Sequence, residues 1–350
     1  MRFIHLADVH LGAVPDKGWP WSSKRGEEIW ETFRRVIAYI RENPVDLLFI
    51  AGDLFHRQPL LRELKEVNYL FTTIPDTRIY MIAGNHDYIR REGGYRGFAW
   101  AENVTFFMEE KVTCVKDPLL PVYVYGFSFH HREIRQELLQ GLAPMEGEGL
   151  HILLAHGGDL EHVPMNIPAL SASGFDYLAL GHIHKPELMI KSGAGYSGSP
   201  EPLDRSETGQ HGFIEGWLEN ERLRVRLVPF ACRSYEQIVV TLNEESTQGS
   251  VEDMVAREII RKGKENIYQI HLRGERAPEL LLLPERFKSL GNVLLVEDAT
   301  RPLYDLELLQ KQYWGTLVGD YIDYFSGRAL TPVEEKALYY GLQALLETSR

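Results

Sequence analysis

The chain has 350 residues, of which 44% are hydrophobic and 25% are charged, and its formal net charge is −12. This balance is typical of a globular protein with two or three domains and a sizeable core. No apolar run is long enough to cross a bilayer, so we expect no membrane association. The acidic charge counts against binding nucleic acid through charge alone, because a phosphate backbone attracts Lys and Arg. Bound divalent cations, a basic patch or a partner would offset this deficit.

Cysteine usage and the first residues predict the compartment. The chain holds only Cys114 and Cys232, which are too few for a disulfide framework. The first residues have no sustained apolar stretch and no small-residue cleavage site, so they do not resemble a secretory signal. Together these features predict a cytoplasmic protein.

The first 230 residues alternate apolar runs with helical patterns, which is typical of an α/β layered domain. Apolar runs predict strands at 3–7, 46–51, 78–83, 122–127, 151–155 and 177–180. Apolar residues at helical spacing predict a helix at 25–41 and another that Pro59 opens and that runs to Phe71. Two extended runs within 212–230 flank Glu219-Asn220-Glu221 and predict a hairpin.

The pattern changes after Arg233. A strand at 237–242, a helix at 251–261 and a strand at 267–272 predict a small α+β module, with 280–284 and 293–296 as candidates for its extension. The tail from Tyr304 is expected to be helical, with a stop near Gly327 and a last helix that begins at the capping box 331–334. The expected domains are therefore 1–233, 234–300 and 301–350.

Polar side chains follow the predicted strands at the points where these end. In open α/β sheets, ligands bind at the carboxyl ends of strands. The glycines beside these side chains allow tight turns and close approach of the backbone. We therefore expect the polar side chains to meet at one site. They are, in chain order, Asp8, His10, Asp53, Asn85, His156, His182 and His184.

This set of residues suits a pair of divalent metals. Hydrolysing a phosphodiester takes a strong nucleophile and compensation for phosphate charge, and two metal ions ~3.5–4 Å apart supply both. Holding two ions takes a bridging carboxylate together with imidazole, carboxylate and amide ligands. Mixed nitrogen and oxygen ligands favour manganese, with iron, zinc and magnesium as alternatives, and disfavour calcium. The absence of thiolates from the set counts against a structural zinc.

Four segments resemble motifs of the calcineurin-like metallophosphoesterase superfamily, and within it the double-strand-break repair nuclease branch, to which the SbcD-type exonucleases belong. The segments are Asp8-Val9-His10-Leu11-Gly12, Gly52-Asp53-Leu54-Phe55-His56, Gly84-Asn85-His86-Asp87 and Tyr196-Ser197-Gly198-Ser199-Pro200. The resemblance covers about residues 1–230. It implies an α/β fold, a layered β-sandwich flanked by helices, followed by a small α+β capping domain and a helical C-terminal tail.

The resemblance also implies a role for each matching residue. One metal would be held by Asp8, His10, Asp53 and His184, and the other by Asp53, Asn85, His156 and His182, so that Asp53 bridges. His86 would lie over the scissile phosphate, stabilise transition-state charge and help protonate the leaving oxygen. His56, where phosphatase relatives carry aspartate, would support His86 and the substrate. Asp87 is expected to orient its loop.

For the rest of the chain, the resemblance implies partners. Residues 234–300 would match a capping domain that helps place DNA over the metals. Residues 301–350 would match a tail that grips the coiled-coil root of an SbcC-like ABC-type ATPase. The stretches 60–72 and 95–102 would match dimerisation helices, which predicts a homodimer, although a core-packing face explains the first stretch equally well.

Other histidines and arginines near these motifs have simpler explanations. Arg90, Arg91 and Arg96 follow the site in a Gly-rich loop, where phosphate contact and a solvated loop are equal alternatives. Arg132 and Arg135 are expected on a solvated helix face. The remaining histidines are expected to be structural: His5, His130, His131, His151, His162, His211 and His271.

We therefore expect a two-metal-dependent DNA exo/endonuclease of DNA repair that attacks the phosphodiester with a metal-activated hydroxide. Two alternatives stay open: a phosphodiesterase acting on small nucleotides, and a protein that mainly binds DNA ends or an ATPase. The size of 234–350 favours a polymer or a partner over a small nucleotide. The complete ligand set favours an enzyme over a binding protein.

Overall fold

The computed structural model describes residues 1–219 and 222–348. Its contacts divide the chain into two compact units, Met1–Tyr235 and Glu236–Arg350. No helix among the described residues is both long enough and apolar enough to span a membrane.

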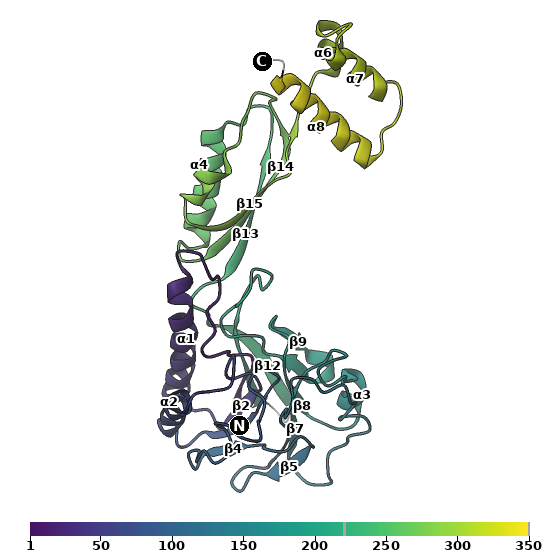
Figure 1. Cartoon of the computed structure of the whole chain (residues 1–350). Helices are drawn as coiled ribbons and strands as arrows, with labels where there is room; N and C mark the ends of the chain where they lie inside the picture. Colours follow the sequence, from purple (N-terminus) through teal and green to yellow (C-terminus); the bar gives the residue numbers. More distant parts are fainter. Residues whose placement is uncertain (220–221, 349–350) are drawn as a thin grey trace. The chain divides into compact units, whose positions relative to one another are not determined.

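Two six-stranded sheets form the N-terminal unit (Figure 1). The first has the order β12-β11-β1-β2-β3-β4 and the second the order β5-β6-β7-β8-β10-β9. The first sheet comprises β1 (Arg2–Leu6), β2 (Leu47–Ala51), β3 (Arg78–Ile82), β4 (Val104–Phe106), β11 (Gly212–Glu219) and β12 (Arg222–Pro229). The second comprises β5 (Thr113–Lys116), β6 (Val122–Gly126), β7 (Leu150–His156), β8 (Tyr177–Gly181), β9 (Glu187–Met189) and β10 (Ala194–Tyr196).

The strands at the centre of each sheet are parallel. β1, β2, β3 and β4 pair in parallel, as do β6, β7, β8 and β10. Their carboxyl ends therefore lie at one edge of each sheet. The predicted hairpin strands pair antiparallel as β11 and β12, while its turn residues 220 and 221 lie outside the described part of the chain.

Alternation along the strands builds two apolar layers. Phe3, Phe49 and Tyr80 pack between the two sheets, whereas Ile4 and Ile50 on the same strands face the other way. That outer layer is covered by α1 (Ser22–Glu42) and α2 (Leu61–Thr72). Figure 1 shows the two helices together on one side of the unit. The second sheet carries α3 (Ile167–Ala172) and a 3-10 turn at Ile190–Ser192. The predicted layered β-sandwich flanked by helices is confirmed.

The start of α2 differs slightly from the sequence-based expectation. The helix begins at Leu61 rather than directly after Pro59, because the Glu63 carboxylate accepts the backbone N–H of Leu60 at 2.8 Å. This bond satisfies one of the amides that a helix N-terminus leaves without a partner.

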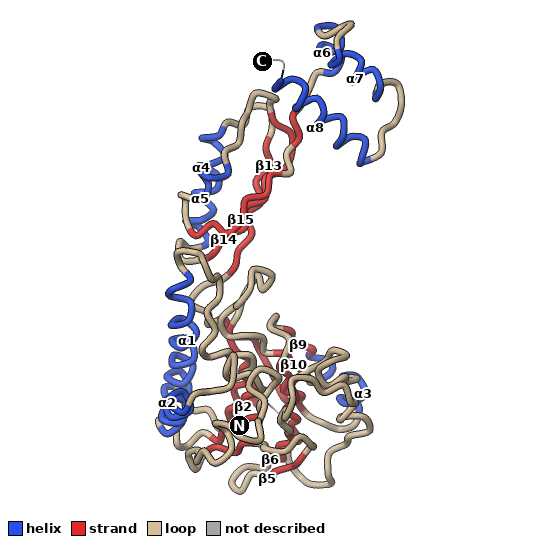
Figure 2. The backbone as a smooth tube through the Cα atoms, viewed as in Figure 1, coloured by secondary structure: helices blue, strands red, loops and turns tan. Residues whose placement is uncertain are grey.

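The C-terminal unit begins with a small sheet. Its order is β13-β14-β15, with β16 on β14, and β14 and β15 are parallel. Apolar residues of α4 and α5 pack on this sheet, and Figure 2 shows both helices on one side of the strands. The elements are β13 (Tyr235–Leu242), α4 (Gln248–Lys262), β14 (Ile267–Arg276), α5 (Pro284–Lys288), β15 (Asn292–Asp298) and β16 (Arg301–Pro302).

Three helices follow: α6 (Leu306–Gln312), α7 (Leu317–Phe325) and α8 (Pro332–Thr348). The apolar stripe predicted as one helix is split at Gly315, which adopts a positive φ of 69°. Gly327, at φ 76°, follows α7 as expected. The predicted capping box is present, since the Thr331 N–H donates to Glu334 at 2.9 Å and the Glu334 N–H to Thr331 Oγ1 at 3.3 Å.

Candidate metal centre

The sequence-predicted ligands lie together at the carboxyl ends of the parallel strands. Asp8 and His10 follow β1, and the 8–11 segment continues the parallel pairing with 52–55 through backbone hydrogen bonds of 2.9–3.1 Å. Asp53 follows β2 and Asn85 follows β3. From the second sheet, β7 ends at His156 and β8 ends one residue before His182.

The local backbone is shaped for this convergence. Asp8, His10 and Asp53 have φ values of 51°, 51° and 49°, a left-handed conformation that costs of order 1–3 kcal/mol for such residues. Two glycines allow the close approach that follows. A Cβ atom at Gly84 would overlap the Asp53 carboxylate, and one at Gly52 would overlap the His156 ring. The glycines of the motifs therefore serve the ligands beside them.

Two groups of side-chain atoms meet at Asp53. In the first, His10 Nε2 lies 3.0 Å from His184 Nε2 and 3.7 Å from Asp53 Oδ2, and His184 Nε2 lies 3.9 Å from Asp8 Oδ1. In the second, His156 Nε2 lies 3.4 Å from the same Asp53 oxygen. It also lies 2.9 Å from Asn85 Oδ1, which completes the second group. Such spacings suit atoms that share a metal at about 2.0–2.2 Å.

Hydrogen bonds leave one ring nitrogen of three histidines free to coordinate. His156 Nδ1 lies 2.9 Å from the Ala51 carbonyl and His184 Nδ1 lies 2.7 Å from Glu207, so Nε2 of each ring is the free nitrogen. His182 is reversed, because its Nε2 lies 2.7 Å from Asp159, which leaves Nδ1. Its ring centroid lies 5.3 Å from that of His156. Histidine ligands usually donate their other N–H to such acceptors, so the donor set fits metal ions.

Burial makes this cluster electrostatically unusual. Burial raises the pKa of Asp8, whereas His156, His10 and His86 outweigh the burial of Asp53 and hold its pKa far below the usual range. Burial would lower the pKa of His156, but Asp53 and Asp8 raise it to about 9. The interior thus holds carboxylates and imidazoles that need each other, or cations, to be stable.

His86 and His56 lie at the exposed rim of the cluster. The His86 backbone N–H donates to Asp53 Oδ1 at 2.9 Å, which ties the residue to the proposed bridging carboxylate. Its Nδ1 lies 3.1 Å from the His56 carbonyl, and the two rings stack with centroids 5.2 Å apart. A nearby ring, His10, lies 4.8 Å from His86 between centroids. Both histidines are thus beside the ligand groups and accessible to a substrate.

Asp87 orients the His86 loop, as expected from the sequence. It accepts hydrogen bonds from the Gly84 N–H at 2.8 Å, the Phe55 N–H at 3.1 Å and the Tyr95 hydroxyl at 2.7 Å. Burial, with the nearby Asp53 charge, raises its pKa to about 6.

Sequence analysis missed Asp159 and Glu207, and it assigned His162 a purely structural role. His162 shares the Asp159 carboxylate with His182, at 3.0 Å. Asp159 had a faint signal, because it follows His156 by three residues in a Gly-Gly-Asp turn. Glu207 had none, because its loop shows no periodicity.

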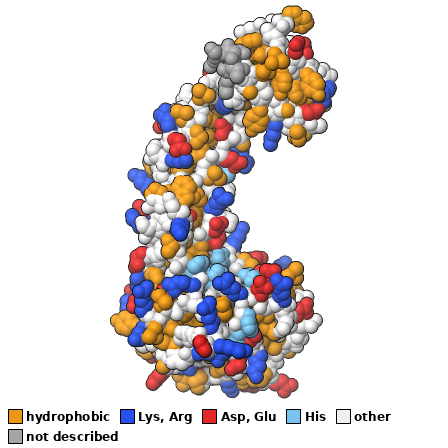
Figure 3. All heavy atoms as spheres, in the orientation of Figure 1, with side chains coloured by type: hydrophobic (Ala, Val, Ile, Leu, Met, Phe, Trp, Pro, Cys, Tyr) orange, Lys and Arg blue, Asp and Glu red, His pale blue; other side chains and the backbone are white. Residues whose placement is uncertain are grey.

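A cavity of about 270 Å³ opens beside His86. Its lining is polar and cationic: His56, Arg57, Gln58, Asn85, His86, Arg90 and Arg132. Figure 3 shows pale-blue histidines bordered by blue Lys and Arg side chains on the N-terminal unit. Arg132 lies in a bend rather than on the predicted helix face, because the segment after β6 forms no helix. The cavity gathers three guanidinium groups without a lining carboxylate.

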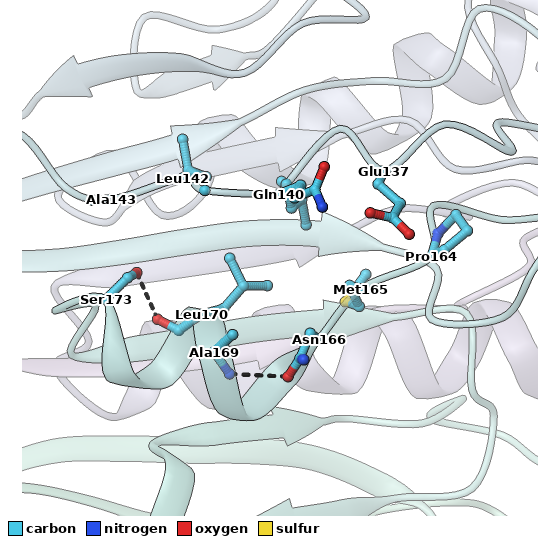
Figure 4. A pocket seen from close by; sticks show the side chains of 12 residues that line it. Glu137, Gln140, Leu142, Ala143, Pro164, Met165, Asn166, Ala169, Leu170 and Ser173 are labelled. Carbon is cyan, nitrogen blue, oxygen red and sulfur yellow. Dashed lines mark hydrogen bonds between the residues drawn. The ribbon is translucent and has the colours of Figure 1, made fainter.

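A second cavity, of about 630 Å³, lies elsewhere in the N-terminal unit and contains none of the candidate ligands (Figure 4). Leu139, Leu142 and Leu170 contribute to its lining. Its polar groups are partly engaged within α3, where Asn166 Oδ1 accepts the Ala169 N–H at 3.0 Å. It is not part of the metal centre.

Comparisons with known proteins agree with this geometry. Residues 1–186 match the family model described as calcineurin-like phosphoesterase. The uncharacterized metallophosphoesterase YhaO of Bacillus subtilis is 28% identical over 306 residues, covering 81% of this chain and 74% of that protein. The DNA double-strand break repair protein Mre11 of Methanocaldococcus jannaschii is 29% identical over 220 residues, which covers 59% and 58%.

Two further matches complete the comparison. The SbcD component of the nuclease SbcCD of Staphylococcus epidermidis is 25% identical over 317 residues, covering 78% of this chain and 79% of that protein. A solved dimetal phosphatase from Danio rerio covers 65% of this chain and 95% of its own, with 12% identity and a TM-score of 0.36. That score is too low to carry an argument.

Proposed function

The chain belongs to the calcineurin-like phosphoesterase family, and from this premise we propose that it is a two-metal DNA nuclease that hydrolyses phosphodiester bonds. The observation that carries the proposal is the position of one Asp53 oxygen, 3.7 Å from His10 Nε2 and 3.4 Å from His156 Nε2. A carboxylate between two ligand groups is what a dinuclear centre requires. When bound, the two ions would activate a water and compensate phosphate charge.

The two ligand groups define the proposed coordination. Asp8, His10, Asp53 and His184 would hold one ion, and Asp53, Asn85, His156 and His182 the other. Imidazole nitrogen with carboxylate and amide oxygen favours manganese, with iron, zinc and magnesium as alternatives. No cysteine belongs to either group, which counts against a structural zinc.

His86 is proposed to stabilise charge and to supply a proton to the leaving oxygen. Its Nδ1 faces the His56 carbonyl, so that N–H is committed to the carbonyl and Nε2 is the nitrogen that faces outward for proton transfer. His56 would keep the His86 ring in place by stacking. Proton transfer by a positioned imidazole contributes typically about 10²–10⁴-fold to a rate.

The arginine-lined cavity favours a polyanionic substrate. Arg57 is partly neutralised by Glu63 at 2.8 Å, whereas Arg90 stacks on the Tyr88 ring with its guanidinium carbon 5.3 Å from the centroid. No hydrogen-bonded carboxylate partner of Arg90 or Arg132 occurs in the described N-terminal unit. These two side chains could meet phosphates next to the scissile one, which offsets the net charge of −12 at this place.

The C-terminal unit supplies the proposed partner contact. Its helices expose apolar side chains such as Trp314, Leu317 and Tyr340, and relatives are named as Mre11 and as the SbcD component of the nuclease SbcCD. We propose that residues 301–350 bind a coiled-coil ABC-type ATPase of the SbcC type. Residues 234–300 would form the capping domain, and the chain would act in the cytoplasm as a homodimer.

The test is cleavage of end-labelled linear duplex DNA by the purified chain with manganese, beside turnover of a small chromogenic phosphodiester. The double variant R90A/R132A should lower cleavage of DNA and leave turnover of the small diester unchanged. The matched control is Arg135→Ala, because Arg135 pairs with Glu133 and Glu161 on the same segment and does not line the cavity.

Robust turnover of the small diester without any DNA cleavage would contradict the nuclease and favour the second candidate, a phosphodiesterase acting on small nucleotides. DNA binding without either activity would favour a protein that mainly binds DNA ends or an ATPase. The complete ligand set argues against that outcome.

A further inference from the structure

Two carboxylates outside the proposed ligand set hold the outer nitrogens of two histidine ligands. Glu207 Oε1 lies 2.7 Å from His184 Nδ1, and Asp159 Oδ2 lies 2.7 Å from His182 Nε2. A carboxylate in this position fixes the tautomer and the direction of a histidine ligand and makes it a stronger base toward the metal. The two histidines belong to different proposed metal sites.

Glu207 is held rigidly. Its side chain is 11% exposed, and its second oxygen accepts the Ser199 hydroxyl at 3.0 Å and the Leu203 N–H at 2.8 Å. The carbonyl of Ser199 in turn lies 2.8 Å from His211 Nδ1. The segment 196–200, which the sequence singled out without a role, thereby fixes the carboxylate that orients His184.

Asp159 is held differently. Its side chain is 47% exposed, and its Oδ1 accepts the backbone N–H groups of Glu161 and His162, both at 2.8 Å. Its Oδ2 serves two imidazoles, because His162 Nδ1 lies 3.0 Å from the oxygen that His182 uses. Water and a second ring therefore compete for the carboxylate that orients His182, and exposure to solvent weakens such a pair.

We propose that Glu207 and Asp159 are positioning residues whose unequal burial makes the two metal sites unequal. The site of His184 is the tight one, and the site of His182 fills last and exchanges its ion. The difference lies in the carboxylates, because the His182 ring is no more accessible than the His184 ring, at 16% and 28% exposed. This inference rests on the proposed two-metal function.

The experiment is a titration of the metal-stripped full chain with Mn²⁺, followed by calorimetry and by the magnetic resonance signal of coupled manganese pairs. The variants are Asp159→Asn and Glu207→Gln, which keep the volume of each side chain and remove its charge. The control is Glu161→Gln, which removes the same charge from the Asp159 turn, where Glu161 pairs with Arg135 rather than with a ligand.

Wild type should show two binding events of unequal affinity. Asp159→Asn should weaken the weaker event about 10–100-fold and leave the tighter one unchanged, while Glu207→Gln should weaken the tighter event by a similar factor. Glu161→Gln should change neither event. Both main variants should retain the circular dichroism of the metal-free wild type.

Three results would overturn the inference: two equal events in wild type, a shift of the tighter event in Asp159→Asn, or no shift in that variant. Should Glu207→Gln fail to fold, Asp159→Asn decides alone, because Asp159 lies on an exposed turn. Binding of fewer than two ions by wild type would instead contradict the proposed two-metal function, which keeps the two failures distinct.

Discussion

The two units of the chain place their unusual residues in opposite environments. In the N-terminal unit, charged and polar side chains are interior, with Asp8 and His10 fully buried and Asp53 1% exposed. In the C-terminal unit, the unusual residues are apolar and superficial, with Trp314 76% and Tyr340 70% exposed. Each unit therefore departs from the usual distribution of side chains in its own direction.

The contrast teaches that the two departures serve different kinds of binding. Buried carboxylates and left-handed residues lower the stability of the N-terminal unit, and they are tolerated where small cations are to be held. Exposed apolar side chains cost the C-terminal unit little stability and suit contact with another protein. Substitutions in the two units should therefore separate hydrolysis from association, and the following predictions test this separation.

The largest expected effect comes from Asp53→Asn. The substitution removes the charge that the two ligand groups share, so turnover of a small chromogenic phosphodiester should fall to the background level. A variant that kept more than about a tenth of the wild-type turnover, a barrier change of only ~1.4 kcal/mol, would show that Asp53 does not bridge the metals. The stability of the metal-free variant should not fall, because an unfavourable buried charge is lost.

His86→Asn should lower kcat by about 10²–10⁴-fold while two manganese ions are still bound. The reason is that His86 is exposed and its Nδ1 faces a carbonyl, so it belongs to neither ligand group. Turnover and metal content are measured on the same sample. Loss of one ion together with the activity would make His86 a ligand and would extend the buried site to its rim.

Manganese should stabilise the N-terminal unit alone. At a free concentration of 100 times Kd, each bound ion adds about 2.7 kcal/mol to the free energy of unfolding. Hydrogen exchange read by mass spectrometry should therefore slow in peptides from 1–235 and stay unchanged in peptides from 236–350. Equal protection of both units would contradict the separation of their roles.

The stability of the N-terminal unit should also depend on pH through His5. Burial lowers the pKa of this histidine from 6.5 to about 3. As pH falls below 6.5, the unfolded chain binds a proton that the folded chain does not, so stability is lost by up to about 1.4 kcal/mol per pH unit down to about pH 3.

His5→Phe removes this titration and serves as the comparison. Between pH 6.5 and 5.0, urea unfolding of the metal-free wild type should lose about 2 kcal/mol more than the variant. Equal losses in the two proteins would show that His5 is protonated in the folded state.

The smallest effect is expected at the exposed apolar surface. Trp314→Ser should change the free energy of unfolding by no more than about 0.5 kcal/mol, because the side chain is mostly in solvent. The matched buried control, Ile322→Ala, should cost about 2–5 kcal/mol. In a pull-down with a coiled-coil ATPase, the first variant should lose the partner although it is folded; retained binding would move the contact elsewhere.

The fold and the ligand groups were predictable because short motifs and strand patterns coincide. Asp8 and Asp53 each follow a strand whose residues are all apolar or buried, and the carboxyl ends of parallel strands meet by geometry. The α/β core was therefore predicted, and so were the strands that carry each ligand. The roles of His56 and His86 remain predictions.

What could not be predicted depends on contacts between loops. Glu207 reaches His184 and Asp159 reaches His182 across separations of 23 residues, with no periodic pattern to signal either contact. Arg132 was assigned to a helix face because its spacing suggested one, yet its segment bends past the cavity. The break of the tail at Gly315 likewise depends on a positive φ that an apolar stripe does not reveal.

The order of the ligands along the chain has a consequence for synthesis. Asp8 and the backbone of His182 meet across 174 residues, and β1 also needs β11 as its edge neighbour. At about 5–20 residues per second, a ribosome takes on the order of 10–30 s to make that stretch. Throughout this interval the emerging Asp8 and Asp53 lack their imidazole neighbours. Metal loading is therefore a late event, and the nascent chain depends on other means to keep these carboxylates from binding the wrong cation.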